Sequence, residues 1–178
     1  MKKQHHTLHS KEQHASHNSK LKYSEKDIFY MKNTVAILIA ALSILILDQL
    51  TKFFVRSQLK LGESAPVIGN LLRIEHSSNT GIAFSLLQGN IWIPAWISIL
   101  AIAAILIFHD SVRNVREGVF LGLILGGIMG NLIDRLTFRA VTDFISFSFW
   151  PSFNIADIGL TVGAIGLAIL IYFRMAKK

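Results

Sequence analysis

The stretch that decides the fold spans residues 118–135 and has the sequence GVFLGLILGGIMGNLIDR. It contains no charge until its last two residues, Asp134 and Arg135. Glycines recur every four residues along it, at Gly122, Gly126 and Gly130. This spacing lets helices approach closely inside a membrane. The stretch therefore predicts a membrane-spanning helix that packs tightly against its neighbours and ends in polar residues.

Three further uncharged apolar runs have the same character and lie at residues 34–47, 91–108 and 158–173. Each run is shorter than the roughly 20 residues that a spanning helix needs, so the helices must include polar residues at their ends. The chain as a whole is 52% hydrophobic and only 16% charged, which is too apolar for an ordinary soluble domain. We therefore expect an all-α membrane protein built as a four-helix transmembrane bundle.

Composition also excludes some functions. The net charge of +7 could indicate a nucleic-acid partner, but the lysines and arginines lie outside the apolar runs and not on one polar face. We expect no nucleic-acid partner. The chain contains no cysteine, which excludes thiolate catalysis and cysteine-based metal sites.

The chain is expected to divide at residue 32. Residues 1–32 are polar and rich in histidine and lysine, and we interpret them as a disordered cytoplasmic tail, within which Met31 is an alternative start site. Metal binding by the tail histidines is an alternative that their irregular spacing disfavours. Residues 33–178 form the predicted four-span domain. Alternating polar and apolar residues within the long connection 56–88 predict a few strands there.

The distribution of lysine and arginine predicts the orientation. With four spans both termini lie on one side, which carries seven of these residues in the tail, two after the second span and three at the C-terminus. The other side carries six. The positive-inside rule then places both termini in the cytoplasm, an inference that depends on the tail. The end of span one, the end of span three and the start of span four consequently meet at the outer face.

Polar residues gather at this outer rim. The first span ends in Asp48 and Lys52, spaced so that both lie on one helix face. The rim also receives Asn131, Asp134, Arg135, Asp143, Asn154 and Asp157. Acidic residues at membrane depth are usually functional and paired. Asp48 with Lys52, and Asp134 with Arg135, are interpreted as such pairs.

Asp143 and Asp157 have no basic neighbour in the sequence and are the candidates for chemistry. Two carboxyl groups held close together do not both ionise easily, so one remains an acid while the other activates water, as in aspartic proteases. Serine–histidine catalysis is disfavoured because only His76 and His109 lie outside the tail, and no HExxH-like motif predicts a metal. Buried acids also relay protons in transporters and channels. A proton-coupled transporter and a non-enzymatic assembly factor therefore remain alternatives.

Five sequence blocks occur in the order typical of one family. They are DQLTK at 48–52, NTGIAF at 79–84, GGIMGNLIDR at 126–135, VTDF at 141–144 and FNIAD at 153–157. On these blocks the chain resembles the lipoprotein signal peptidases, also called signal peptidase II, over most of residues 35–178. Two positions depart from the family's common residues: Ile82 in place of alanine, and Thr142 in place of an aliphatic residue.

The resemblance implies an aspartic endopeptidase whose catalytic dyad is Asp143 and Asp157. Residues that would shape the site or contact substrate are Asp48, Lys52, Asn79, Gly81, Asn131, Arg135 and Asn154. No cofactor or metal is implied. The implied substrates are prolipoproteins, cut before a cysteine that already bears a diacylglyceryl group, with membrane lipid as the surroundings. The enzyme would span the bacterial cytoplasmic membrane with its active site at the outer face and a small extracytoplasmic β-cradle at 56–88.

The aromatic segment 144–153 is expected to be a loop at the membrane interface, where aromatic residues are favoured. Its apolar side chains would contact lipid or substrate.

Overall fold

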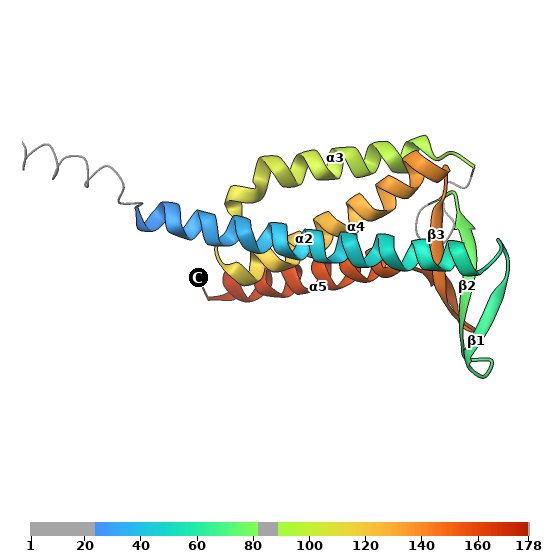
Figure 1. Ribbon diagram of the computed structural model, residues 1–178. Coiled ribbons are helices and arrows are strands. Elements are labelled where there is room, and N and C mark those ends of the chain that lie inside the picture. The colour runs from blue at the N-terminus through green and yellow to red at the C-terminus, as the bar shows by residue number, and fades with distance from the viewer. Residues whose placement is uncertain (1–23, 82–88, 178) are drawn as a thin grey trace, which may run out of the picture. The chain divides into compact units, whose positions relative to one another are not determined.

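The structure is a computed structural model that describes residues 24–81 and 89–177 (Figure 1). The chain divides into a unit of residues Met1–Lys32 and a unit of residues Asn33–Lys178, and the second unit carries the fold described below. Its elements in chain order are helix α2 (Glu25–Gln58), strands β1 (Ser64–Ile68) and β2 (Leu72–Asn79), helix α3 (Trp92–Phe108), the 3₁₀ turn η2 (His109–Ser111), helix α4 (Val115–Phe138), strands β3 (Val141–Phe147) and β4 (Trp150–Phe153), and helix α5 (Ile155–Ala176).

Four helices within the described residues are long and apolar enough to cross a membrane, which confirms the predicted four-helix fold. Helices α2, α4 and α5 are longer than their apolar runs, because they include flanking polar residues as expected. Helix α3, with 17 residues, stays within its run. Helix α2 continues to Gln58, so that Asp48, Lys52 and Arg56 follow one another on successive turns. Helix α2 begins at Glu25. Residues 1–23 of the predicted tail lie outside the described residues, as does Ile82, one of the two positions that depart from the family's common residues.

Helix α4 packs closely between α2 and α5. A Cβ atom added at Gly122 would meet the carbonyl oxygen of Ile37 in α2, and one added at Gly126 would meet that of Ala41. On the α5 side, a Cβ atom at Gly163 would lie against the α4 backbone. The glycine spacing in the sequence therefore marks two real helix–helix approaches, in which backbone lies directly against backbone.

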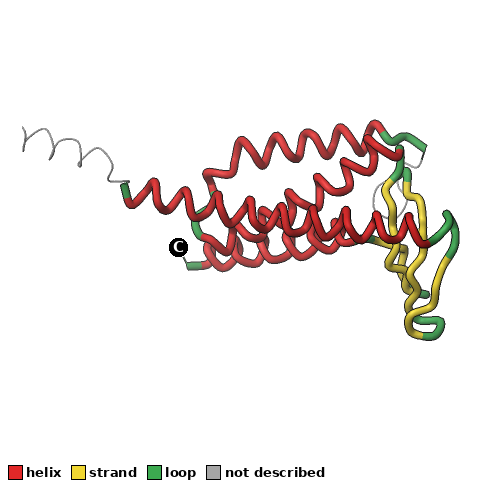
Figure 2. Tube along the Cα trace, viewed as in Figure 1, coloured by secondary structure: helices red, strands yellow, loops and turns green. Residues whose placement is uncertain are grey.

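The strands form one antiparallel sheet in the order β1-β2-β3-β4. Figure 2 shows them at one end of the helical bundle, where α2 and α4 end and α5 begins. Strand β3 pairs with β2 along its length, with Asp143 opposite Ser77 and Val141 opposite Asn79. The sheet therefore places a residue from the connection between α4 and α5 beside the connection that follows α2.

The position of the sheet corrects two expectations from the sequence. The strands are not confined to 56–88, and the segment 144–153 is not a loop, since β3 and β4 supply half of the sheet. The phenylalanine-rich segment has the aromatic and β-branched side chains that fit a sheet surface. Aromatic residues are equally favoured at a membrane interface, so this composition alone does not distinguish a strand from an interfacial loop.

The close approach of α4 to α2 predicts whether one substitution stabilises or destabilises the protein. Replacing a helical glycine by alanine normally favours the helix by about 1 kcal/mol. Gly126→Ala should instead destabilise the protein by about 1–3 kcal/mol, the usual effect of overpacking, because the new methyl group meets the Ala41 backbone. The measurement is the thermal unfolding midpoint in detergent. Ser43→Ala, at an exposed position of α2, is the control and should change stability by less than about 0.5 kcal/mol. A more stable Gly126→Ala protein would contradict the packing.

Candidate active site

Asn154 brings Asp143 and Asp157 together. It is a buried residue at the N-cap of α5, where its side-chain oxygen accepts a hydrogen bond from the Asp157 backbone N–H at 3.0 Å. The Asp157 carboxylate accepts the Asn154 backbone N–H in return, at 3.2 Å. The Asn154 side-chain nitrogen donates to Asp143 Oδ1 at 2.6 Å. One residue therefore contacts both carboxyl groups, and its capping role fixes them at the start of α5.

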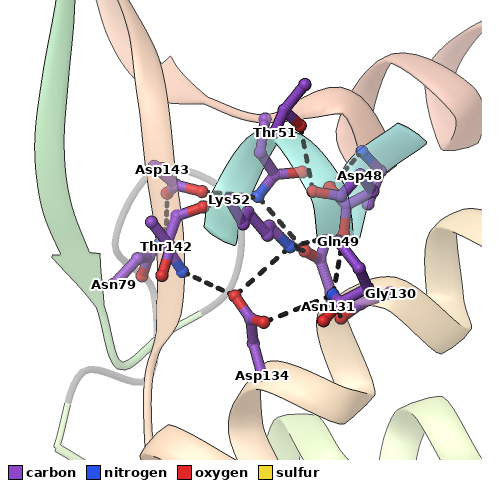
Figure 3. Close-up of polar contacts among 12 residues, drawn as sticks. Asp48, Gln49, Thr51, Lys52, Asn79, Gly130, Asn131, Asp134, Thr142 and Asp143 are labelled. Carbon is purple, nitrogen blue, oxygen red and sulfur yellow. Dashed lines mark hydrogen bonds and ion pairs between the residues drawn. The ribbon is translucent and has the colours of Figure 1, made fainter. Parts of the chain in front are cut away.

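Asp143 lies on β3 with only 4% of its surface exposed. Its second oxygen, Oδ2, accepts a hydrogen bond from the side-chain nitrogen of Asn79 at 2.9 Å (Figure 3). Asn79 is the last residue of β2, so the pairing of β2 with β3 delivers this donor. Both oxygens of Asp143 thus contact neutral amide donors.

Burial, together with the neighbouring charge of Asp157, raises the pKa of Asp143 to about 7. The hydrogen bonds from Asn79 and Asn154 and the positive charge of Lys52 act in the opposite direction and are outweighed. An ordinary aspartate has a pKa near 3.9. Asp143 is therefore a carboxyl group that can carry a proton near neutral pH.

Asp157 lies in the first turn of α5 and is less deeply buried than Asp143. Its Oδ1 accepts a hydrogen bond from the side-chain nitrogen of Asn131 at 2.8 Å. The Asn131 oxygen accepts from Lys52 Nζ at 2.9 Å. Because an ammonium group can only donate, Lys52 fixes which end of the Asn131 amide faces Asp157.

Lys52 is completely buried, and its ammonium group has three acceptors. These are Asp48 Oδ2 at 2.8 Å, Asp134 Oδ2 at 3.4 Å and the Asn131 oxygen (Figure 3). An ammonium group has three protons, so all of its donor capacity is used. The sequence-based prediction that Asp48 and Lys52 form a pair is confirmed.

Asp48 and Asp134 each use a second interaction to hold a neighbouring element. Asp48 Oδ1 accepts the backbone N–H of Ala156 in α5 at 2.9 Å. Asp134 Oδ2 accepts the backbone N–H of Thr142 in β3 at 2.9 Å. The Gln49 side chain lies between the two acids, donating to Asp48 Oδ2 at 3.1 Å and to Asp134 Oδ1 at 3.3 Å. Gln49 belongs to the first family block, but its position in the sequence does not predict that it bridges two acids.

Asp134 does not form the predicted ion pair with Arg135. Its basic partners are Lys52 and Arg56, the latter at 3.5 Å. Consecutive residues on a helix point in different directions, which explains the difference. Arg135 instead donates to the Gly81 carbonyl oxygen at 3.1 Å, and its Nε has no hydrogen-bond partner among the described residues.

A pocket of about 790 Å³ lies beside the two aspartates. Polar residues at its lining include Asn79, Asn131, Arg135, Asp143 and Asp157. Apolar residues from β4 and α5 complete it, namely Trp150, Pro151, Phe153, Ile158, Leu160 and Val162. The structure therefore joins one charged and one apolar surface in a single cavity. Within residues 24–81 and 89–177 no three His, Asp or Glu side chains are grouped so as to hold a metal ion.

Comparison with known proteins matches residues 40–173 to the family described as signal peptidase (SPase) II. The lipoprotein signal peptidase of Geobacillus kaustophilus is 41% identical over 140 residues, covering 75% of this chain and 90% of the relative. That of Shouchella clausii is 44% identical over 135 residues, covering 74% and 89%. A bacterial membrane enzyme solved by the in meso method at 2.3 Å resolution superposes with a TM-score of 0.75 at 32% identity, covering 80% of this chain and 90% of that one.

The chain belongs to the signal peptidase II family. This confirms the resemblance found in the sequence and the expectation of a multi-pass membrane peptidase of the aspartic type. Described residues from all five family blocks, which lie far apart in the sequence, meet in one network that includes Asn154 and Lys52. All nine predicted site residues lie within this network or line its pocket. Their catalytic roles remain predictions.

The raised pKa of Asp143 predicts how stability depends on pH. Because the folded protein holds this proton more tightly than the unfolded chain, the free energy of unfolding should fall as pH rises from about 4 to about 7. Asp143→Asn removes this titration. The variant should therefore lose less thermal stability than the wild type between pH 5 and pH 8, measured as unfolding midpoints in detergent.

Glu25→Gln is the control for this measurement. Glu25 is an exposed residue in the first turn of α2, so the variant should keep the wild-type pH dependence. If Asp143→Asn loses as much stability as the wild type over the same range, Asp143 does not titrate in this window.

Proposed function

We propose that this signal peptidase II removes signal peptides from prolipoproteins, with Asp143 and Asp157 as its catalytic dyad. The observation that carries the proposal is that Asn154 contacts both carboxyl groups at the edge of one pocket. Two acids in such a position share protons unequally, which is the arrangement that aspartic peptidases need. The names of the curated relatives support lipoprotein precursors as the substrate class.

The two aspartates have different surroundings, and these favour different roles. Asp143, whose pKa is raised to about 7, is the member that carries the proton and acts as the acid. Asp157 lies at the N-terminus of α5, where the helix dipole stabilises a negative charge, and acts as the base. Asp157 takes a proton from water, whose oxygen adds to the scissile carbonyl carbon. Asp143 gives its proton to the carbonyl oxygen, which yields a tetrahedral gem-diol. Asp157 then gives its proton to the leaving amine as the C–N bond breaks, and Asp143 takes back a proton from the diol, so that a carboxylic acid forms and both aspartates return to their starting states.

The surrounding residues hold this dyad and leave one donor for substrate. Asn131 and Asn154 orient the carboxyl groups, and Lys52 orients Asn131. Arg135 lines the pocket with its Nε free of any hydrogen bond to the described residues. A buried donor without an acceptor is unfavourable, and a carbonyl oxygen of the substrate would supply that acceptor. We assign Arg135 to substrate contact for this reason.

The apolar wall of the pocket supports a substrate that lies within the membrane. Ile158 and Val162 of α5 and Trp150 of β4 line the pocket and are also exposed on the surface of the protein. The cavity is therefore continuous with a surface that lipid would cover. We propose that the acyl chains of a diacylglyceryl-modified cysteine lie along this wall, while the peptide bond before that cysteine reaches the dyad.

The proposed orientation places the dyad at the outer face of the bacterial cytoplasmic membrane and both termini in the cytoplasm. It is supported by the excess of lysine and arginine on the side of the termini. The sheet lies at the opposite end of the bundle from the C-terminus (Figure 1), and Asp143 lies on β3 of that sheet.

Conservative substitution of either aspartate tests the dyad. Asp143→Asn and Asp157→Asn should each lower cleavage of a diacylglyceryl-modified prolipoprotein by about a hundredfold or more, because each removes one general acid or base. The measurement is the appearance of the released signal peptide with purified enzyme in detergent. Asp110→Asn should cleave like the wild type. Cleavage by both dyad variants at the wild-type rate would eliminate the proposal; loss of proton flux in vesicles, with no peptide product from the wild type, would favour a transporter instead.

The pH profile gives a separate test. The active form has one protonated and one ionised carboxyl group, so cleavage should fall on both sides of an optimum. The alkaline limb should lie near pH 7, where Asp143 loses its proton. Initial rates at saturating substrate from pH 4 to pH 9 measure both limbs. A rate that does not fall between pH 6 and pH 9 would contradict the role of Asp143 as the acid.

A further inference from the structure

Thr142, the residue immediately before Asp143, is held at three points. Its backbone N–H donates to Asp134 Oδ2 at 2.9 Å. Its carbonyl oxygen accepts from the Asn154 side chain at 3.3 Å. Its hydroxyl oxygen accepts from Arg56 at 2.9 Å. The third contact depends on the Thr142 hydroxyl group, which an aliphatic residue at this position would lack.

Arg56 makes this contact from the last turns of α2. Its Nη1 atom, which has two protons, donates to the Thr142 hydroxyl and also lies 3.5 Å from Asp134 Oδ1. The carbon at the centre of its guanidinium group lies 4.3 Å from the centre of the Phe138 ring, so it rests on the end of α4. Its side chain is only 20% exposed. One guanidinium group therefore links α2, α4 and β3 next to the proposed acid.

We propose that Arg56 is a positioning residue, which through the Thr142 hydroxyl fixes the place of Asp143 relative to Asn154 and the rest of the dyad. The proposal rests on the catalytic role of Asp143 proposed above. Arg56 lies outside the residues that line the pocket, so it acts through Thr142 and not on substrate.

The link supports β3 at the point where its regular pairing with β2 ends. Strand pairing with β2 is interrupted by a bulge between Ile74 and Ser77, close to the partner of Asp143. A bulge re-aims the neighbouring side chains and weakens the ladder locally. Side-chain contacts to Thr142 then add to the pairing of residues 141–143 with β2 in fixing the position of the strand. A displacement of about 1 Å at a catalytic group typically costs a hundredfold in rate, so even a small shift would be measurable.

Substitutions at both ends of the link test it. Thr142→Val keeps the β-branched shape and removes the hydroxyl, while Thr142→Ser keeps the hydroxyl. Arg56→Gln removes the guanidinium group. Lys60→Gln is the matched control, because it removes a positive charge from an exposed residue near the end of the same helix, where the backbone N–H of Lys60, and not its side chain, donates to Glu63. Each protein is assayed for kcat and KM with the diacylglyceryl-modified precursor, together with Arg56→Gln/Thr142→Val and Asp143→Asn.

We expect kcat to fall about tenfold in Arg56→Gln and in Thr142→Val, with KM within about twofold of the wild type. The double variant should also fall about tenfold, since both changes break the same contact and their effects do not add. Thr142→Ser and Lys60→Gln should retain the wild-type kcat. A merely structural role would lower the amount of active enzyme in both Thr142 variants and leave no rescue by serine.

Three outcomes would overturn the inference. The first is a wild-type kcat in Thr142→Val while Asp143→Asn is inactive, which leaves the proposed function intact. The second is a double variant that falls about a hundredfold, which means that Arg56 and Thr142 act independently. The third is a wild-type rate in Asp143→Asn, which removes the proposed function and this inference with it. Should Arg56→Gln fail to accumulate in membranes, the comparison of Thr142→Val with Thr142→Ser decides by itself.

Discussion

The site depends on the burial of one ammonium group. Lys52 is fully buried, and an unpaired charge in such a place would cost several kcal/mol. Its ammonium group therefore requires three acceptors close to it, and these are Asp48, Asp134 and Asn131. Two come from α4 and one from α2, so the charge holds these two helices in register. Because Asn131 accepts from Lys52 with its oxygen, only its nitrogen is left to face Asp157. A structural ion thus determines the orientation of a group that contacts the dyad.

The same ionic cluster also positions the elements that carry the dyad. Asp48 bonds the backbone of Ala156, one residue before Asp157, and Asp134 bonds the backbone of Thr142, one residue before Asp143. Each aspartate of the dyad therefore follows a residue whose N–H is anchored by a carboxylate paired with Lys52. Breaking a buried ion pair leaves an uncompensated charge and typically costs about 3–5 kcal/mol. Stability and the geometry of the proposed dyad are consequently hard to separate at this cluster. The contact of Arg56 with the Thr142 hydroxyl lies at its edge and involves no fully buried charge.

Much of this arrangement could be predicted from the sequence, and the rest could not for definite physical reasons. Apolar runs identify spanning helices, and helical spacing places Asp48 beside Lys52, as the structure confirms. Spacing along one helix gives no information about partners on another helix, so Asp134 was paired with Arg135 and not with Lys52. The pairing of β2 with β3 likewise joins residues far apart in the sequence, so local sequence patterns do not predict it. Gln49 and Arg56 lack any local signal, since their importance comes only from what α4 and β3 place beside them.

The glycines of α4 belong to the same constraint as the polar cluster. Asp and Asn side chains are short, so they reach between helices only where the helix backbones nearly touch. A Cβ atom at Gly130 would occupy the place of the Asp48 carboxylate, and one at Gly127 would meet the carbonyl oxygen of Ala156. Absence of a side chain at these two positions lets Asp48 cross from α2 to the N–H of Ala156 in α5. Lipid supplies no hydrophobic force that would draw helices together, so close backbone packing and buried polar contacts have to do so jointly. In this chain the close-packed glycines and the buried polar side chains occupy the same part of α4, residues 127–134. The polar contacts need the close approach of the backbones, and they in turn hold the backbones together.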